Sequence, residues 1–137
     1  MNRRELLHAS LAGLLTQLLL PAADAAETYR ETLIFQQELP AVSLEDWTVR
    51  VVALEFPAGG APTPAHRHPG FVLGYVLDGA VWFQMQDRPK RRLSAGQVFY
   101  EPPGEIHVTT YSASDTQPAK AIALVFGAAD QALTLPV

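Results

Sequence analysis

The sequence predicts an all-β fold, either a sandwich or a barrel. Short segments rich in β-branched and aromatic residues recur along the chain, and glycine or proline stands in most of the intervals between them. No helical period is visible after residue 26. With 48% of its 137 residues apolar, the chain can bury a core. We see no internal linker, so residues 26–137 are predicted to form one domain.

The strands are predicted from these segments and from the turn-forming residues between them. Residues 57–64 contain three prolines and two glycines, which excludes a helix there. Asp78 and Gly79 form a strong signal for a two-residue hairpin between their flanking strands. In chain order, the predicted strands are residues 28–37, 47–56, 71–77, 80–86, a short one at Leu93, 97–100, 106–111 and 119–126.

The first 25 residues are predicted to be a cleavable export signal. Arg3 and Arg4 precede an apolar run that ends at Pro21, and residues 23–25 read Ala-Asp-Ala. The arginine pair is similar to a twin-arginine signal, with a Sec signal and an amphipathic first helix as alternatives. The run is too short for a comfortable membrane span. We therefore expect a periplasmic or secreted protein with no stable membrane span after cleavage.

Composition narrows the classes of function. The chain has no cysteine, which excludes disulfides, thiolate metal ligands and cysteine nucleophiles. The net charge of −4 argues against nucleic acid as a partner. The basic cluster at residues 88–92 is interpreted as a solvated turn.

Three histidines are the candidate metal ligands. His66 and His68 are two positions apart on a predicted extended segment, so their side chains should leave the same face. His107 begins another predicted strand after a Pro-Pro-Gly turn. The fourth histidine, His8, would leave with the signal, and the other three would be the whole histidine content of the mature protein.

The spacings around these histidines resemble the two motifs of the cupin superfamily. Gly60, His66, His68 and Gly79 follow the first motif, and the segment from Gly96 through Pro102 and Gly104 to His107 follows the second. The resemblance covers roughly residues 47–126. It implies a double-stranded β-helix (jelly-roll) barrel in which His66, His68 and His107 hold one divalent transition metal ion: Fe, Mn, Ni, Cu or Zn.

The chain departs from the cupin pattern at two positions. The usual glutamate ligand is replaced by Val72, and the usual asparagine after the third histidine by Tyr111. With neutral ligands alone, the ion would be a stronger Lewis acid, or it would bind weakly or not at all. Glu101 or Gln84 could supply the missing ligand, or either could face solvent. Glu101 and Tyr111 are also candidate proton shuttles.

Residues an even number of positions apart share a face of a strand, and this rule predicts which residues form the cavity wall. Tyr111 and Thr109 should share a face with His107, and Trp82 should share one with Gln84. Phe71, Tyr75, Trp82 and Phe99 are candidates for an aromatic substrate pocket, with ordinary packing as the alternative.

Two functions from different classes remain open. The first is an exported metal-dependent enzyme of dioxygenase type, acting on a small organic molecule that chelates the ion. The second is a non-catalytic protein that binds a small ligand or the metal itself. The resemblance also makes a homodimer plausible, with residues 28–37 as the pairing strand.

Overall fold

The computed structural model describes residues 29–137, so the predicted export signal at residues 1–25 lies outside the described residues. Residues Thr32–Val137 form one compact unit. Over the range that the model describes, the chain folds into strands and turns, and it contains no helix with the length and apolarity of a membrane span.

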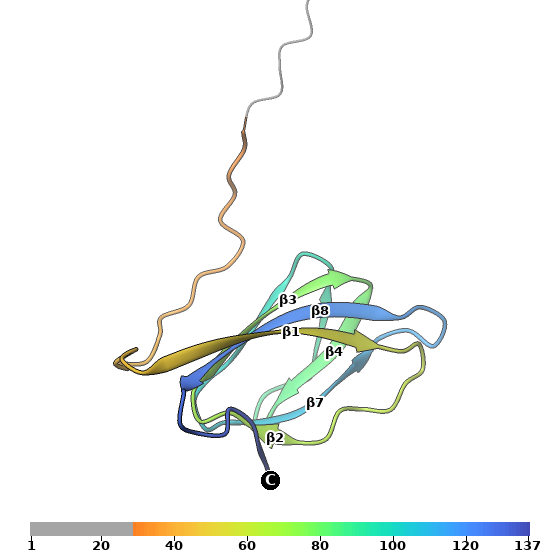
Figure 1. The fold of residues 1–137 in the computed structure, drawn as a ribbon. Helices are drawn as coiled ribbons and strands as arrows, with labels where there is room; N and C mark the ends of the chain where they lie inside the picture. Colours follow the sequence, from red (N-terminus) through yellow and green to blue (C-terminus); the bar gives the residue numbers. More distant parts are fainter. Residues whose placement is uncertain (1–28) are drawn as a thin grey trace, which may run out of the picture. The chain divides into compact units, whose positions relative to one another are not determined.

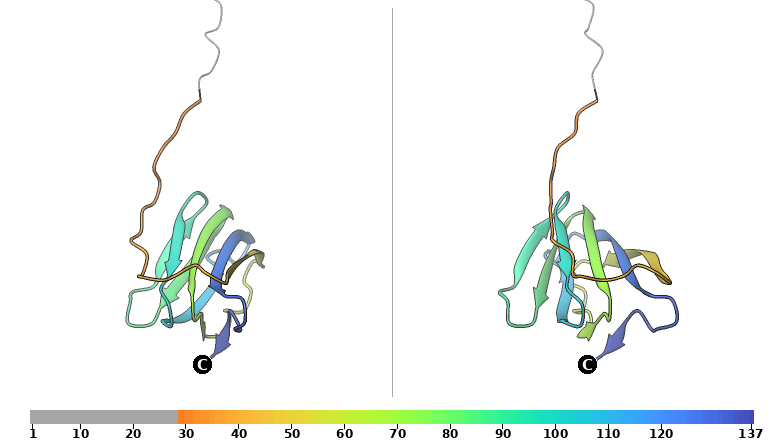
Figure 2. Two further views of the ribbon diagram at one scale, coloured as in Figure 1. Left: turned by 60° about the vertical axis from the view of Figure 1, so that its left-hand side comes forward. Right: turned by 90° about the vertical axis from the view of Figure 1, so that its left-hand side faces the viewer.

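Within residues 29–137, nine strands form two antiparallel sheets (Figures 1 and 2). One sheet has the order β1-β8-β3-β6, and the other has the order β5-β4-β7-β2-β9. The two-sheet, all-β arrangement confirms the predicted fold class. The strands are β1 (Trp47–Phe56), β2 (His66–Arg67), β3 (Phe71–Asp78), β4 (Ala80–Met85), β5 (Arg91–Ser94), β6 (Val98–Glu101), β7 (Ile106–Ser112), β8 (Ala119–Ala128) and β9 (Leu135–Pro136).

The core lies between the inner faces of the two sheets. Burial alternates strictly along β8, where every second residue from Ala119 to Gly127 is buried. β4 alternates in the same way, with Val81, Phe83 and Met85 buried. This period of two is the pattern expected when one face of a sheet packs on the other.

The predicted hairpin at Asp78 and Gly79 is wrong. β3 and β4 do not pair with each other, because β3 pairs with β6 and β8, whereas β4 pairs with β5 and β7. The dipeptide instead forms a corner where the chain passes from one sheet to the other. Gly79 has a φ of 69°, so the local turn chemistry is as expected and only the partners of the strands differ.

The predicted strand at residues 28–37 is also wrong over its described part. Residues 29–46 contain no strand. The segment has suitable β-branched and aromatic residues, but no strand within residues 29–137 pairs with it. A strand needs a partner ladder as well as propensity.

Candidate metal centre

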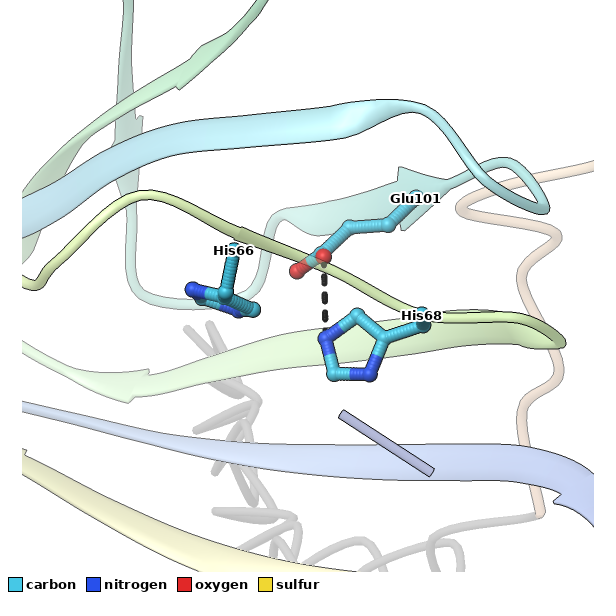
Figure 3. A group of neighbouring side chains, drawn as sticks. All are labelled: His66, His68 and Glu101. Carbon is cyan, nitrogen blue, oxygen red and sulfur yellow. Dashed lines mark ion pairs between the residues drawn. The ribbon is translucent and has the colours of Figure 1, made fainter. Parts of the chain in front are cut away.

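Four polar side chains from four separate positions converge on the inner face of the barrel. His66 on β2 lies directly opposite His107 on β7, and His68 follows β2 on the same side. Glu101, the last residue of β6, reaches them from the other sheet (Figure 3). The ligand atoms of His66, His68 and Glu101 all lie within 4.8 Å of one another, so this group could hold a metal ion.

Backbone carbonyls fix which nitrogen of each ring faces the centre. A carbonyl only accepts hydrogen bonds, so the ring nitrogen beside it carries the proton and the other nitrogen of a neutral ring carries the lone pair. The three bonds run from His66 Nδ1 to Pro64 O (2.9 Å), from His68 Nδ1 to Leu133 O (2.7 Å) and from His107 Nε2 to Thr109 O (3.0 Å). The lone pairs of His66 Nε2, His68 Nε2 and His107 Nδ1 are therefore free for a ligand.

The free nitrogens meet one another and the Glu101 carboxylate at short range. His66 Nε2 lies 3.3 Å from His107 Nδ1. The two Glu101 oxygens lie 3.4 Å from His68 Nε2 and 3.4 Å from His107 Nδ1. Glu101 Oε2 is buried without a hydrogen-bond partner among the described residues. Acceptors facing acceptors repel unless a proton or a metal cation lies between them.

The spacing also fits a metal ion. Two ligand atoms about 2.1 Å from one ion and at a tetrahedral angle lie about 3.4 Å apart. Three imidazole nitrogens and one carboxylate oxygen form a donor set that suits first-row transition metals. The carbonyl bonds behind each imidazole are the outer contacts that orient histidine ligands. The residues present therefore fit a divalent transition metal ion.

Burial shapes the protonation of these groups in the metal-free protein. Burial raises the pKa of Glu101 to about 8. Burial, followed by charge repulsion from His66, lowers the pKa of His107 to about 4. Burial is also the main cause of the lowered pKa of His68. The metal-free centre thus favours neutral imidazoles and a protonated carboxyl, which must lose its proton to bind a cation.

Glu101 stands where the usual glutamate would point. Val72, at the usual glutamate position, pairs directly with Glu101 across β3 and β6. Directly paired residues point to the same face of a sheet, so both side chains face the cavity. The carboxyl group lies one strand away from its expected place, so a group that could serve as the negative ligand is present in the centre. The expected set of neutral ligands alone, with its stronger Lewis acidity, is therefore not what the structure presents.

A cavity of about 200 Å³ lies beside the four groups. Apart from them, its wall is mainly apolar and draws on both sheets. The other lining residues are Val52, Leu54, Phe56, Thr63, Val72, Phe99, Thr110, Ala123, Val125 and Thr134. The only ionisable lining residues in the described range are His66, His68, Glu101 and His107.

Tyr111 and Thr109 do not share a face with His107, contrary to the parity prediction. The β4–β7 register shifts, so that Gln84 pairs with Thr109 while Met85 pairs with His107, which leaves Val108 as an extra residue on β7. Such a bulge reverses the alternation on one side of it. Tyr111 instead accepts a hydrogen bond from Lys90 Nζ at 2.9 Å on the outer face, so it does not touch the cavity.

The structure does not bring Gln84 to the histidines either. Gln84 lies on the outer face of β4 together with Trp82, and its amide donates to the Arg88 carbonyl at 3.5 Å. Trp82 pairs with Tyr111, and Lys90 Nζ lies 5.5 Å from the centre of each ring.

Of the four aromatic residues predicted to line the pocket, only Phe99 does so. Phe71 stacks on Phe126 with ring centroids 4.7 Å apart, on the face of β3 that points away from Val72. Tyr75 lies on this same outer face and is exposed. Phe99 packs over Gly74, its direct partner on β3, where a Cβ would overlap the phenyl ring.

Sequence reasoning missed Thr110 and the cavity wall formed by β1. Thr110 Oγ1 lies 2.7 Å from His107 Nε2, and the bulge that places it there leaves no signal in the sequence. The even-numbered apolar residues from Val52 to Phe56 did carry a signal, since their alternation with outward-facing residues marks one face of a strand.

Comparison with known families decides the identity of the fold. The family model described as "Cupin domain" matches residues 52–125. The chain belongs to the cupin family. The match spans β2, β3 and β7, which carry or adjoin the histidines. No match was found among curated proteins.

Solved structures similar to this cupin include proteins of differing function. The DMSP lyase DddQ from Ruegeria pomeroyi DSS-3 is 28% identical with a TM-score of 0.56, and the match covers 65% of this chain and 43% of that one. A cupin-like protein from Thermotoga maritima is 25% identical with a TM-score of 0.52, covering 67% and 65%. An oxalate oxidase in complex with glycolate shares the fold at 18% identity, with a TM-score of 0.53 and coverage of 78% and 65%. The match thus spans less than half of the lyase.

Proposed function

We propose that this cupin is an enzyme that binds one divalent transition metal ion (Fe, Mn, Ni, Cu or Zn) through His66, His68, His107 and Glu101. The observation that carries the proposal is the convergence of three fixed imidazole lone pairs on one buried carboxyl group. When bound, such an ion would supply Lewis acidity beside the cavity, and Fe, Mn or Cu would also supply redox chemistry, which Zn would not.

The substrate class follows from the cavity. About 200 Å³ admits only a small molecule, and the mainly apolar wall favours a compact carbon skeleton. No lysine or arginine lines the cavity within the described residues, so an anionic oxygen would bind at the metal centre. We therefore infer a small organic anion such as an enolate, a phenolate or a hydroxy acid. Phe99 and Val125 would exclude water from its carbon skeleton.

Of the reactions considered, a dioxygenase-type reaction requires the fewest side-chain acids and bases. Reactions that move protons between carbon atoms need a base beside the substrate. Among the described cavity residues, Glu101 is the only carboxylate, and it belongs to the proposed ligand set. The single proton that an enol or hydroxy acid loses on binding could pass to the Glu101 oxygen that does not bind the ion, so Glu101 would stay in the ligand set. Oxidation by O₂ as second substrate requires no further side-chain base.

A second candidate is a metal-dependent lyase. The observation that favours it is the 28% identity to DMSP lyase DddQ, which is higher than the identity to the oxalate oxidase. In that reaction Glu101 would have to leave the metal and take a proton from carbon.

One experiment separates these functions. The full chain is purified, its metal content is measured, and the Fe²⁺-loaded protein is given a panel of enolates, phenols and thiols in an oxygen electrode. O₂ uptake with a matching product supports the dioxygenase, and substrate loss without O₂ uptake supports the lyase. Tight metal and ligand binding without turnover would make the protein a binder. His66→Ala should abolish metal binding. Arg67→Ala, which changes an exposed neighbour, should leave metal binding unchanged. Failure of the wild type to bind any metal would overturn the proposal.

We also propose export to the periplasm or beyond, on the strength of the order of residues in positions 1–25. Cell fractionation of the full chain tests it. Arg3→Lys with Arg4→Lys should block a twin-arginine route and leave a Sec route working.

A homodimer is the third proposal. Residues 32–46 form no strand and expose Leu33, Ile34 and Leu44, which are 60% or more accessible. Exposed apolar groups in the segment that precedes β1, together with the unpaired edge of β1, favour contact with a second copy. Light scattering after size exclusion should give a dimer mass that Leu33→Asp with Ile34→Asp reduces and Gln37→Asp does not.

A further inference from the structure

Arg50 occupies an unusual place on the inner face of the first sheet. Arg50 pairs with Val125, Val125 pairs with Val72, and Val72 pairs with Glu101, so these four residues form one row across β1, β8, β3 and β6. Directly paired residues share a face, and the two valines and Glu101 line the cavity. Arg50 therefore begins on the cavity side of its strand.

The cavity wall next to this arginine is accessible to solvent. Val52, the next residue on the same face of β1, lines the cavity and is still 38% exposed. Arg50 itself is exposed and forms no ion pair within residues 29–137. Its row spans three strand spacings, so the Cα atoms of Arg50 and Glu101 are about 14 Å apart. Arg50 does not itself line the cavity, but a guanidinium that reaches over the cavity from this position would face the metal centre from the side of β1.

The remaining polar groups of the wall are already engaged. Thr63 Oγ1 accepts a hydrogen bond from the Thr110 amide at 2.8 Å. Thr110 Oγ1 lies 2.7 Å from His107, and Thr134 Oγ1 lies 3.3 Å from His68 Nδ1. A second charged group on a ligand would thus find its counter-charge at Arg50.

We propose that Arg50 is a specificity-determining residue that selects ligands with a carboxylate at the end remote from the metal. This inference rests on the proposed function, because it assumes that the ligand's first anionic group binds at the metal centre. Guanidinium and carboxylate form two parallel hydrogen bonds, which a lysine cannot reproduce. The favoured class is a small dicarboxylate or an oxo or hydroxy acid with a second carboxylate.

The test compares matched acids on the Co²⁺-loaded full chain. Malonate, succinate and glutarate are each titrated against the monocarboxylate with the same number of carbons, using the cobalt absorption spectrum and calorimetry. In wild type, at least one dicarboxylate should bind about tenfold more tightly than its partner. Arg50→Gln should remove this preference and change monocarboxylate affinity by less than about twofold. Arg50→Lys should keep part of the preference. Arg92→Gln, which removes the same charge from the other sheet, should keep the full preference for dicarboxylates.

The outcomes separate the two proposals. If Co²⁺ does not bind to the wild type, the proposed function fails and the role of Arg50 fails with it. If Co²⁺ and the acids bind but neither wild type nor Arg50→Gln distinguishes the pairs, only the role of Arg50 is overturned. An inward charge on an edge strand can also prevent edge-to-edge pairing. A changed oligomer mass for Arg50→Gln, with its ligand preference intact, would assign that role instead and overturn the proposal.

Discussion

The two walls of the metal centre are built by different rules. On the β3–β6 side the ladder is regular, and Glu101 lies opposite Val72 with its side chain on the same face. On the β7 side a bulge at Val108 interrupts the ladder between His107 and Thr109. On the regular side the faces alternate along the strand, so the ladder register fixes the face of a ligand. On the bulged side it does not, and Thr110 rather than Thr109 comes to the cavity.

This difference explains how the centre keeps a carboxylate without the usual glutamate. In a regular ladder, two directly paired positions project to the same region from neighbouring strands. A ligand can therefore move from one strand to the next while its functional group stays in place. A bulged ladder offers no such exchange, because the extra residue changes which positions face inward.

Exchanging the carboxylate across the regular ladder tests this idea with the largest expected effect. Glu101→Val should lower metal affinity by at least about 100-fold, because it removes a ligand and not only an outer contact. Adding Val72→Glu should recover at least about tenfold, since the carboxylate then reaches the same row from β3. Chelator competition with Zn²⁺ measures both values. If Glu101→Val binds Zn²⁺ as wild type does, Glu101 is not a ligand.

The sequence predicted the histidines well and the rest of the centre poorly, for physical reasons. His66 and His68 are two residues apart, so only a local extended backbone was needed to place them together. The face of Glu101 depends on the register between β3 and β6, which is a nonlocal property, and it stayed open. Tyr111 was misplaced because one extra residue in β7 reversed the parity. Asp78 and Gly79 show the same limit, because turn chemistry is local while the choice of sheet is not.

The regular ladder also depends on a missing side chain. A Cβ at Gly74 would overlap the Phe99 ring that covers it. Gly74→Ala should therefore push Phe99 into the cavity and destabilise the protein by about 3 kcal/mol. Gly104 has a φ of 72° and nothing within 4 Å of an added Cβ, so Gly104→Ala should cost only about 1 kcal/mol of backbone strain. Urea unfolding of the metal-free protein measures the free energy of unfolding of both variants. Equal losses of stability would contradict the packing argument.

The two walls should also respond differently to pH in the metal-free protein. The pKa of Glu101 is raised from 4.5 to about 8, so between these pH values the unfolded chain has released this proton while the folded chain still holds it, and pH 6.5 to 8 is the upper window of that range. Stability from this group falls as pH rises through that window, by about 2 kcal/mol. The pKa of His107 is lowered to about 4, so its contribution is lost in the opposite direction, as pH falls from 6.5 towards 4.

Glu101→Gln isolates the first of these effects. An amide does not titrate, and its NH₂ group can donate to a histidine lone pair. Metal-free Glu101→Gln should therefore keep its stability between pH 6.5 and 8, where metal-free wild type loses it. Urea unfolding at several pH values measures this. Parallel curves for the two proteins would show that Glu101 is not the responsible group.

A pair of adjacent threonines gives the smallest and most local test of the bulge. Thr110 Oγ1 lies 2.7 Å from His107 Nε2, so Thr110→Val should loosen the imidazole and lower metal affinity by about tenfold. Thr109 Oγ1 is buried without a partner in the described part of the chain, so Thr109→Val removes only an unsatisfied hydroxyl. That variant should bind metal as wild type does and be equally or slightly more stable. Zn²⁺ competition on both variants decides between the bulged and the regular register. If Thr109→Val were the weaker binder, β7 would run without its bulge, and Tyr111 would return to the cavity face.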